Sequence, residues 1–317
     1  MHSMDFTAKV RLPAAGSGKP RPPQRVPNGE FATRRGFLKG SASVLLMSGL
    51  GSVLLSACGG GGLSPDAADT PRLASVDNFR DVGGAAGGYQ TVDGRQVRLG
   101  VFYRSNTLTL SAADKAVIDT LRIANVYDLR TPGEVTRVPD VLPAGAAYLN
   151  INVTGARDEV VPPDELPGGA IAVMESAERA YVTGEAERAG YGALLTQLAN
   201  NPGAQLFHST AGKDRAGWVA ALLLSIANVP LDVIVQDYLL TNTYSAESIS
   251  ARVAAVQAQG GAASAALDAP LFSVQESFLQ AGFDQVQASY GTMSSYLTAG
   301  LGLSQASIDT LHDRLVI

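Results

Sequence analysis

Cysteine is almost absent from this chain of 317 residues, which contains only Cys58. A single cysteine cannot build a disulfide framework within one chain. Histidine is scarce as well, and a set limited to His2, His208 and His312 argues against a zinc cluster. A membrane-spanning run is also lacking, because the apolar stretch 44–57 covers only 14 residues with Ser and Gly among them, whereas a spanning helix needs about 20.

Residues 1–57 have the composition of an export signal. Residues 1–30 are rich in Pro, Gly and basic side chains, and Arg-Arg-Gly-Phe-Leu-Lys at 34–39 precedes the apolar stretch. A basic segment, a short apolar segment and small residues before a cleavage point are typical of such signals. The paired arginines resemble the twin-arginine signal, whose cargo crosses the membrane already folded. Leu-Ser-Ala-Cys at 55–58 resembles the bacterial lipobox, in which the cysteine is acylated and becomes the first residue.

This resemblance implies export by the twin-arginine route and a lipid anchor on Cys58, facing the periplasm at the cell envelope. Gly59 after the cysteine favours the outer over the inner membrane by the same resemblance, and residues 58–70 are predicted to form a Gly-rich tether. With Cys58 acylated, no thiol remains for chemistry. A transmembrane anchor is the alternative, and the shortness of the apolar stretch argues against it.

The charge balance changes when the signal is removed. Residues 1–57 carry eight of the 24 basic residues and two of the 29 acidic ones, so the remaining chain has a net charge near −11. An acidic surface argues against nucleic acid or an anionic bilayer as a broad electrostatic partner. Any anion must therefore be bound by a local cluster of donors.

Residues 71–317 read as one α/β domain without internal repeats. Alternation of strands and helices predicts a mixed, mainly parallel sheet flanked by helices. The predicted strands are 97–103, 123–129, 146–153 and 205–208. The predicted helices are 111–121, capped by Ser111, a region around 174–191, and 217–227, 231–243, 250–258, 273–281, 289–299 and 304–314. The segment 155–191 is either a disordered surface insertion or a helical lid over the site.

The most informative segment passes from the apolar strand 205–208 through a polar turn into the very apolar helix 217–227. Its sequence from residue 208 is His-Ser-Thr-Ala-Gly-Lys-Asp-Arg-Ala-Gly. Such a turn directs successive backbone N–H groups inward, and the helix that follows adds its positive end. Arg215 adds a guanidinium fork that matches two phosphate oxygens. These features predict a phosphate-binding loop.

This segment resembles His-Cys-x-x-Gly-Lys-Asp-Arg-x-Gly, the signature loop of the cysteine-dependent phosphatases, in the bacterial branch that acts on phosphotyrosine and phosphoinositides. Further motifs of that branch follow in the same order: Asn-Phe-Arg-Asp-Val-Gly-Gly at 78–84, Tyr-Arg-Ser at 103–105, Asp-Leu-Arg-Thr at 128–131 with Glu134, and Asp-Tyr-Leu-Leu at 237–240. The resemblance covers residues 71–317. It implies a cysteine-phosphatase-like fold.

The resemblance also implies the role of each loop residue. Asp214 is the general acid, and Arg215 binds the phosphate and the transition state. The remaining phosphate-binding positions are Thr210, Ala211, Gly212, Lys213, Ala216 and Gly217. The implied supporting residues are His208, Arg80, Asp81, Asp128 and Arg130, together with Arg104 and Glu134.

Several of these residues have a plainer interpretation that the sequence leaves open. Arg80 and Asp81 form either a structural ion pair or part of the pocket. Lys213 is either a solvated lysine or a contact to a second phosphate, and Asp214 either protonates the leaving group or pairs with a neighbouring arginine. His208 is expected to lie behind the loop and to hydrogen-bond its backbone.

Ser209 stands where the family has its nucleophilic cysteine. A phosphate loop lowers the pKa of a cysteine thiol from about 8.5 to about 3.5–7.5, whereas a serine hydroxyl needs a positioned base or a metal to become a nucleophile. His208 is a poor base for it, because neighbouring strand residues point to opposite faces. Ser209 is either an introduced substitution that stops turnover or a natural variant that is inactive or feebly active.

The sequence therefore leaves three functional hypotheses. The first is a phosphatase domain that binds and hydrolyses phosphomonoesters of a phosphorylated protein or a phosphoinositide-like substrate, without a metal or organic cofactor. The second is a catalytically impaired lipoprotein that binds a phosphorylated ligand. The third is a structural envelope protein whose loop is a vestige.

Overall fold

The computed structural model describes residues 70–155 and 169–317. The predicted export signal 1–57, the predicted acylation site Cys58 and all but the last residue of the predicted tether 58–70 lie outside the described residues. All described residues belong to one compact unit, Gly60–Ile317. No helix within the described ranges is both long and apolar enough to cross a bilayer.

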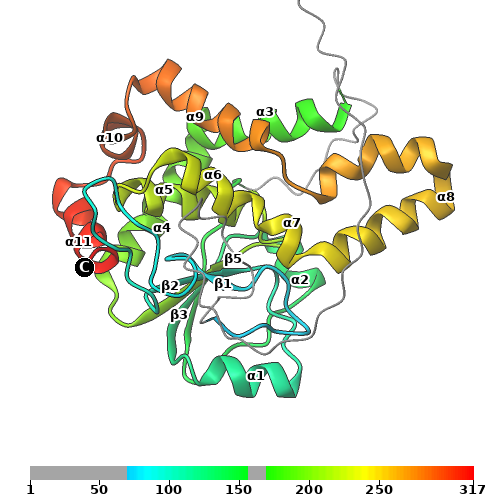
Figure 1. Cartoon of the computed structure of the whole chain (residues 1–317), viewed down its shortest axis with the longest axis horizontal. Coiled ribbons are helices and arrows are strands. Elements are labelled where there is room, and N and C mark those ends of the chain that lie inside the picture. The colour runs from blue at the N-terminus through cyan, green and yellow to red at the C-terminus, as the bar shows by residue number, and fades with distance from the viewer. Residues whose placement is uncertain (1–69, 156–168) are drawn as a thin grey trace, which may run out of the picture. The chain divides into compact units, whose positions relative to one another are not determined.

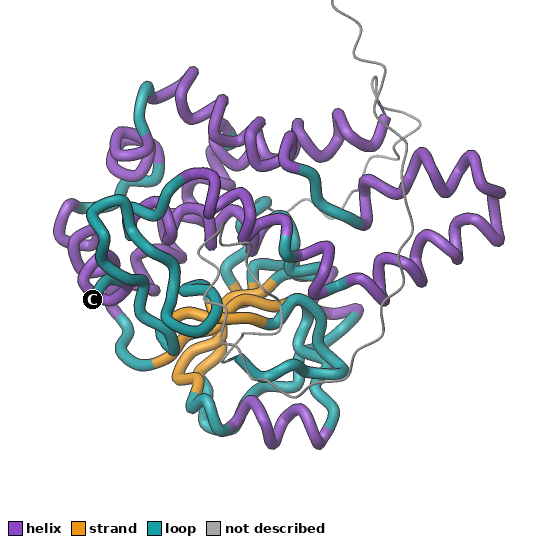
Figure 2. The backbone as a smooth tube through the Cα atoms, in the orientation of Figure 1, coloured by secondary structure: helices purple, strands orange, loops and turns teal. Residues whose placement is uncertain are grey.

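The centre of the fold is a five-stranded sheet in the order β1-β2-β5-β3-β4 (Figures 1 and 2). Only the short edge pair β1–β2 is antiparallel, and the other three pairs are parallel. The strands are β1 Arg80–Asp81, β2 Phe102–Ser105, β3 Ile123–Asp128, β4 Ala147–Asn150 and β5 Ala204–His208. The prediction of a mixed, mainly parallel sheet flanked by helices is confirmed.

Neighbouring residues of the central strands pack into two different cores. On β3, Val126 faces one apolar cluster and Tyr127 the other; on β5, Leu206 and Phe207 divide in the same way. This follows from the alternation of side chains along a strand, and a parallel sheet needs cover on both faces. Figure 1 shows α1 on one side of the sheet and α4, α5 and α6 on the other.

The helices mostly follow their local signals. Ser111 caps α1 through a hydrogen bond from the Asp114 amide, and Thr131 and Glu134 form a capping box at the start of α2. The helices are α1 Ala112–Asp119, α2 Pro132–Arg137, α3 Gly169–Thr183, α4 Glu185–Asn200, α5 Arg215–Ile226, α6 Leu231–Leu239, α7 Thr241–Tyr244, α8 Ala246–Phe272, α9 Glu276–Tyr290, α10 Met293–Ser295, the π-helical turn η3 Tyr296–Gly300 and α11 Gln305–Leu315.

Several predicted elements differ from the structure. The helix predicted at 231–243 is divided into α6 and α7, and the helix predicted at 289–299 is divided at Gly291 between the end of α9 and the short α10 and η3. The strand predicted at 97–103 begins only at Phe102, because Gly100 has a φ of +79° and Val97 forms just an isolated bridge with Val316. The helix predicted at 250–258 is part of the longer α8, which is interrupted at Gly261, where φ is +81°. Alanine-rich sequence on both sides of that glycine continues the helix, and periodicity alone does not reveal this.

The segment 155–191 is largely helical where it is described. Helix α3 packs against α8 and α9, and residues 156–168 lie outside the described residues. Tyr191 belongs to α4 and is fully buried in the main core. The described part of the segment is therefore packed structure, and the movement of α3 as a lid stays a prediction.

Candidate active site

The carboxyl ends of three strands meet at one edge of the sheet. The register places His208, the last residue of β5, opposite Ser105 on β2 and Asp128 on β3. Ligands of open α/β sheets bind at this edge, where loops leave the strands. The loop 209–214 begins here and runs directly into α5, whose first residue is Arg215.

Gly212 gives the loop its shape. Its φ is +66°, and a Cβ atom there would lie 2.3 Å from the carbonyl oxygen of Ser105. Only glycine adopts this conformation at so close an approach. Asn78 Nδ2 donates to the Gly212 carbonyl at 2.6 Å, and Arg104 Nη2 donates to the same oxygen at 2.8 Å and to the Lys213 carbonyl at 3.1 Å. Asn78 and Arg104 thus bind two carbonyl groups of the loop.

The amide groups of the loop have the complementary arrangement. In a trans peptide the N–H points away from the C=O, so the Lys213 and Asp214 amides face away from Asn78 and Arg104. The amides of residues 210–214 donate no hydrogen bond to any described residue. Consecutive free donors before a helix form an anion-binding cradle. The helix that follows adds its partial positive charge.

Arg215 turns toward this loop and is held by Glu134. Its Nη1 and Nη2 donate to the two carboxylate oxygens of Glu134 at 2.7 and 2.8 Å, and the Thr210 hydroxyl donates to the same carboxylate. Burial by itself would raise the pKa of Glu134, but the bonds from Arg215, Thr210 and the Thr131 amide lower that pKa to about 2. Glu134 is therefore ionised and fixes the guanidinium beside the cradle.

Lys213 and Asp214 form a second ion pair. Lys213 Nζ lies 2.9 Å from Asp214 Oδ1 and 4.0 Å from the sulfur of Met174 on α3. The lysine side chain is 6% exposed and that of Asp214 is 19% exposed. Lys213 is thus not a solvated surface lysine, and the partner of Asp214 is this lysine instead of a neighbouring arginine.

Two arginines behind the loop share Asp237 of α6. Arg80 Nε and Arg104 Nη1 each lie 3.3 Å from one oxygen of this carboxylate. Burial lowers the pKa of Arg104 to about 9, and repulsion from Arg80 adds to this while Asp237 opposes it. Asp81 binds the Gly83 amide through Oδ1 at 2.7 Å. Arg80 therefore supports the loop indirectly, through Asp237 and its neighbour Arg104.

His208 differs from its expected role. Its Nε2 lies 3.1 Å from Oδ2 of Asp140, and neither ring nitrogen has a hydrogen-bond partner among the described residues. The side chain therefore does not hydrogen-bond the loop backbone. Its position at the end of β5 directs it toward the neighbouring carboxylates instead.

Arg130 neutralises the acidic cluster around His208. Its Nη2 lies 2.7 Å from Asp128 Oδ2 and 2.8 Å from Asp140 Oδ2. Asp128, Asp140 and His208 could together offer three ligand atoms to a metal. The guanidinium already occupies both carboxylates, so this donor set is a buried ion-pair network and a poor cation site.

The structure brings together most of the residues predicted from the sequence. Ser209 is 2% exposed at the start of the loop, and Ala216 and Gly217 are buried in the first turn of α5. Sequence reasoning did not assign site roles to Asn78 or Asp237. A charged residue inside the apolar helix 231–239 was a readable signal for Asp237.

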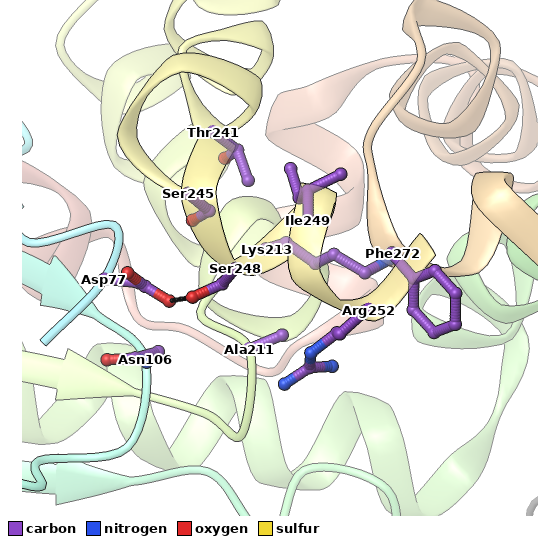
Figure 3. Close-up of a pocket in the computed structure, with 10 residues that line it drawn as sticks. All are labelled: Asp77, Asn106, Ala211, Lys213, Thr241, Ser245, Ser248, Ile249, Arg252 and Phe272. Atoms are coloured by element: carbon purple, nitrogen blue, oxygen red, sulfur yellow. Dashed lines mark hydrogen bonds between the residues drawn. The ribbon is translucent and has the colours of Figure 1, made fainter. Parts of the chain in front are cut away.

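A small pocket adjoins the loop on the side of α8. Figure 3 shows Lys213 and Ala211 lining it from the loop and Arg252 from α8, with Phe272 at the far end of that helix. Arg252 is exposed and forms no ion pair with a described residue. The pocket therefore carries two cationic groups beside the cradle, together with the Asp77 carboxylate, which accepts a hydrogen bond from the Ser248 hydroxyl.

Comparison with known proteins agrees with this geometry. Over 246 residues the chain is 32% identical to a protein of Cupriavidus necator whose name assigns it provisionally to the tyrosine-protein phosphatases, covering 74% of this chain and 85% of that protein. It is 27% identical over 282 residues to the triple specificity protein phosphatase PtpB of Mycobacterium tuberculosis, covering 77% and 98%. A tyrosine-protein phosphatase of Nostoc commune is 32% identical over 139 residues, covering 43% and 46%.

Residues 71–317 as a whole match the tyrosine phosphatase family. This range contains the sheet, the loop and every described residue of the site. With its amide cradle and fixed arginine at the carboxyl end of β5, the chain belongs to the tyrosine phosphatase family.

Proposed function

We propose that this chain binds phosphomonoesters in the loop 209–214 and the first turn of α5, residues 215–217. The observation that carries the proposal is the set of free amides at residues 210–214 beside the guanidinium of Arg215. Free amides and a guanidinium on neighbouring residues match the oxygens of a tetrahedral dianion. The anchoring of Arg215 by Glu134 lowers the cost of ordering that side chain when the anion binds.

Hydrolysis in the active form proceeds through a phospho-enzyme. A nucleophile at position 209 attacks phosphorus, and the loop amides and Arg215 stabilise the equatorial oxygens. Asp214 protonates the leaving oxygen as its bond to phosphorus breaks. A water molecule then releases phosphate. With serine at position 209 the attacking atom is weak, so the alternative function is phosphate binding by a catalytically impaired lipoprotein.

The pocket of Figure 3 supports a substrate with more than one anionic group. Lys213 and Arg252 both line this pocket beside the cradle, and Arg252 forms no ion pair with a described residue. A phosphoinositide-like headgroup carries further phosphates that would reach them, whereas phosphotyrosine carries one. The relative named as having triple specificity is consistent with a wide substrate range in this family.

Anion binding is tested by thermal unfolding of the chain with orthovanadate, phosphotyrosine or inositol trisphosphate. Each anion should raise the melting temperature, with a stabilisation of about 2.7 kcal/mol at 100 times its Kd. Arg252→Ala should reduce the thermal stabilisation by inositol trisphosphate. This reduction should be at least about fivefold larger than the reduction of the stabilisation by phosphotyrosine. Absence of any anion effect would leave the loop as a vestige, and equal weakening would remove Arg252 from substrate recognition.

We further propose that the chain is exported and anchored through a lipid on Cys58. Cys58→Ser should abolish incorporation of labelled palmitate and move the protein from the membrane fraction to the soluble periplasmic fraction. Replacing Arg34 and Arg35 together by lysine should instead retain it in the cytoplasm, because the twin-arginine route requires that pair. Palmitate labelling that persists in Cys58→Ser would contradict the anchor.

A further inference from the structure

The pocket beside the loop is lined along one face of α8. Four of its lining residues recur at helical spacing and share the side of α8 that faces the loop: Ser245, Ser248, Ile249 and Arg252. A helix rises about 1.5 Å per residue, so about 10 Å separate Ser245 from Arg252 along the axis. The pocket therefore has hydroxyl groups at the start of α8 and a guanidinium two turns further on (Figure 3).

The hydroxyl end of this pocket lies directly against the phosphate loop. The backbone nitrogen of Asn106 lies 2.6 Å from the position that a Cβ atom would take on Gly212. The same backbone amide donates to the Asp77 carbonyl at 3.0 Å. Asn78, the next residue after Asp77, donates through Nδ2 to the Gly212 carbonyl at 2.6 Å. These contacts fix Asp77 and Asn106 at the border of the cradle.

Two polar side chains at this end lack hydrogen-bond partners. Ser245 is only 8% exposed, yet its buried Oγ bonds to no described residue. The buried Oδ1 of Asn106 accepts no hydrogen bond from a described residue either. Ser245 precedes α8 without capping it through its side chain, so its hydroxyl has no local role in the helix. Buried polar atoms without partners are uncommon, and those that line a pocket are satisfied by water or by a ligand.

Asp77 adds a carboxylate to this set of oxygen atoms. The Ser248 hydroxyl donates to its Oδ2, and no described residue donates to its Oδ1. Three oxygen atoms that can accept a hydrogen bond therefore line one end of the pocket, on Asp77, Asn106 and Ser245. They call for a ligand group that carries a hydrogen-bond donor.

The remaining residues of the pocket decide which donor fits. An ammonium group would meet Lys213 and Arg252, which line the same pocket, whereas a hydroxyl group is a neutral donor that also offers lone pairs to these cations. Ile249 and Phe272 add an apolar wall, which suits the C–H faces of a polyhydroxylated ring. An aryl ester such as phosphotyrosine would leave the acceptors unpaired. A site built for hydroxyl groups rejects an analogue that lacks them.

We propose that Asp77, Asn106 and Ser245 form a hydroxyl-binding subsite that selects phosphate monoesters of polyhydroxylated alcohols over aryl phosphates. The phosphoryl group lies in the cradle, and neighbouring hydroxyl groups of the alcohol donate to these three residues. The Asp77 carboxylate repels a second phosphate at this end, so the subsite recognises hydroxyl groups and not added charge. The inference deepens the proposed function and rests on it, because the subsite acts only on an ester whose phosphate occupies the loop.

The test compares two monophosphates that share a six-membered carbon ring. Inositol 1-phosphate carries a hydroxyl group on each remaining ring carbon, whereas cyclohexyl phosphate carries none. Calorimetric titration of the full chain should give a Kd for inositol 1-phosphate at least about 20-fold below that for cyclohexyl phosphate. Ser245→Ala, Asn106→Ala and Asp77→Asn should each reduce this preference about threefold, the scale of one lost hydrogen bond, without weakening the binding of cyclohexyl phosphate. The combined variant should bind both esters alike.

A competition experiment distinguishes a free ester from a lipid headgroup as the source of the ligand. Phosphatidylcholine vesicles with and without phosphatidylinositol 4-phosphate are added to the chain loaded with inositol 1-phosphate. Displacement by the phosphoinositide vesicles alone identifies a lipid headgroup, and absence of displacement identifies a soluble ester. Either result supports the subsite, because inositol 1-phosphate is bound at the start.

Ser264→Ala is the matched control, because Ser264 lies on α8 outside the pocket and bonds the Gly260 carbonyl of its own helix. It should change neither Kd. Equal binding of both esters by the unaltered chain would overturn the subsite, leave phosphate binding intact and mean that only water fills the pocket. Equal weakening of both esters by the three single variants would give these residues a structural role and overturn it too. If neither ester nor orthovanadate binds, the proposed function itself fails.

Discussion

Ser209→Cys should raise phosphate release from 4-nitrophenyl phosphate by at least about 10³-fold, since a nucleophile that acts together with its neighbours contributes on that scale or above. The substitution places a thiol among free amides and beside Arg215, where positive potential lowers the pKa of a cysteine. The thiolate is then abundant at neutral pH, whereas a serine hydroxyl in the same place stays neutral. The measurement is steady-state phosphate release with the unaltered chain in parallel.

The control for this experiment is Ser225→Cys near the end of α5. Among the described residues, the Ser225 hydroxyl bonds only the Ala221 carbonyl of its own helix, so a thiol there lies outside the cradle. Its phosphate release should equal that of the unaltered chain. If Ser209→Cys releases no more phosphate than this control although vanadate stabilises both, the chain is a phosphate-binding protein and the phosphatase proposal is wrong.

Arg215→Ala should remove stabilisation by vanadate and, in the Ser209→Cys parent, lower kcat by about 10³-fold or more, the scale of an arginine that stabilises a phosphoryl transition state. It should also lower the free energy of unfolding by about 2–4 kcal/mol, because Glu134 keeps its charge but loses a bidentate partner. Thermal unfolding at several pH values, with and without vanadate, measures both effects.

The sign of the pH dependence follows from Glu134. Its pKa is lowered to about 2 in the folded chain, below an unfolded value of about 4.3. Its stabilisation is therefore present above about pH 4.3 and is lost as pH falls toward 2. Arg215→Ala should lose much of this acid sensitivity. Adding Glu134→Gln should recover stability without recovering vanadate binding, and recovery of binding by the double variant would contradict the assigned role of Arg215.

Much of the fold follows from local patterns. Interactions among neighbouring residues are enough to predict three of its elements. These are α1 with its capping serine, the apolar strand 204–208 and the helix that follows the loop. The prediction of a strand over 97–103 was wrong for its first residues, and the reason is local as well. Gly100 has a positive φ that interrupts the strand, and β2 begins only after it. Its apolar residues did not reveal that break.

The side chains that build the site, in contrast, contact partners that lie far away in the sequence. Glu134 reaches Arg215 across 81 positions, and Asn78 reaches Gly212 across 134. Asp237 joins two arginines that come from other elements. The order of strands in the sheet and the packing of the helices bring such partners together. No periodicity in the sequence predicts them.

By itself, the sequence determined that a polar loop with a glycine and an arginine lies between an apolar strand and an apolar helix, because these features need only neighbouring residues. It predicted phosphate binding by that loop. Only the tertiary structure decided what surrounds that loop. It set Glu134 against Arg215, placed Asp237 against Arg104, and placed Met174 of α3 against Lys213. The physical reason is that charge and burial act through space, whereas the loop's own geometry acts along the backbone.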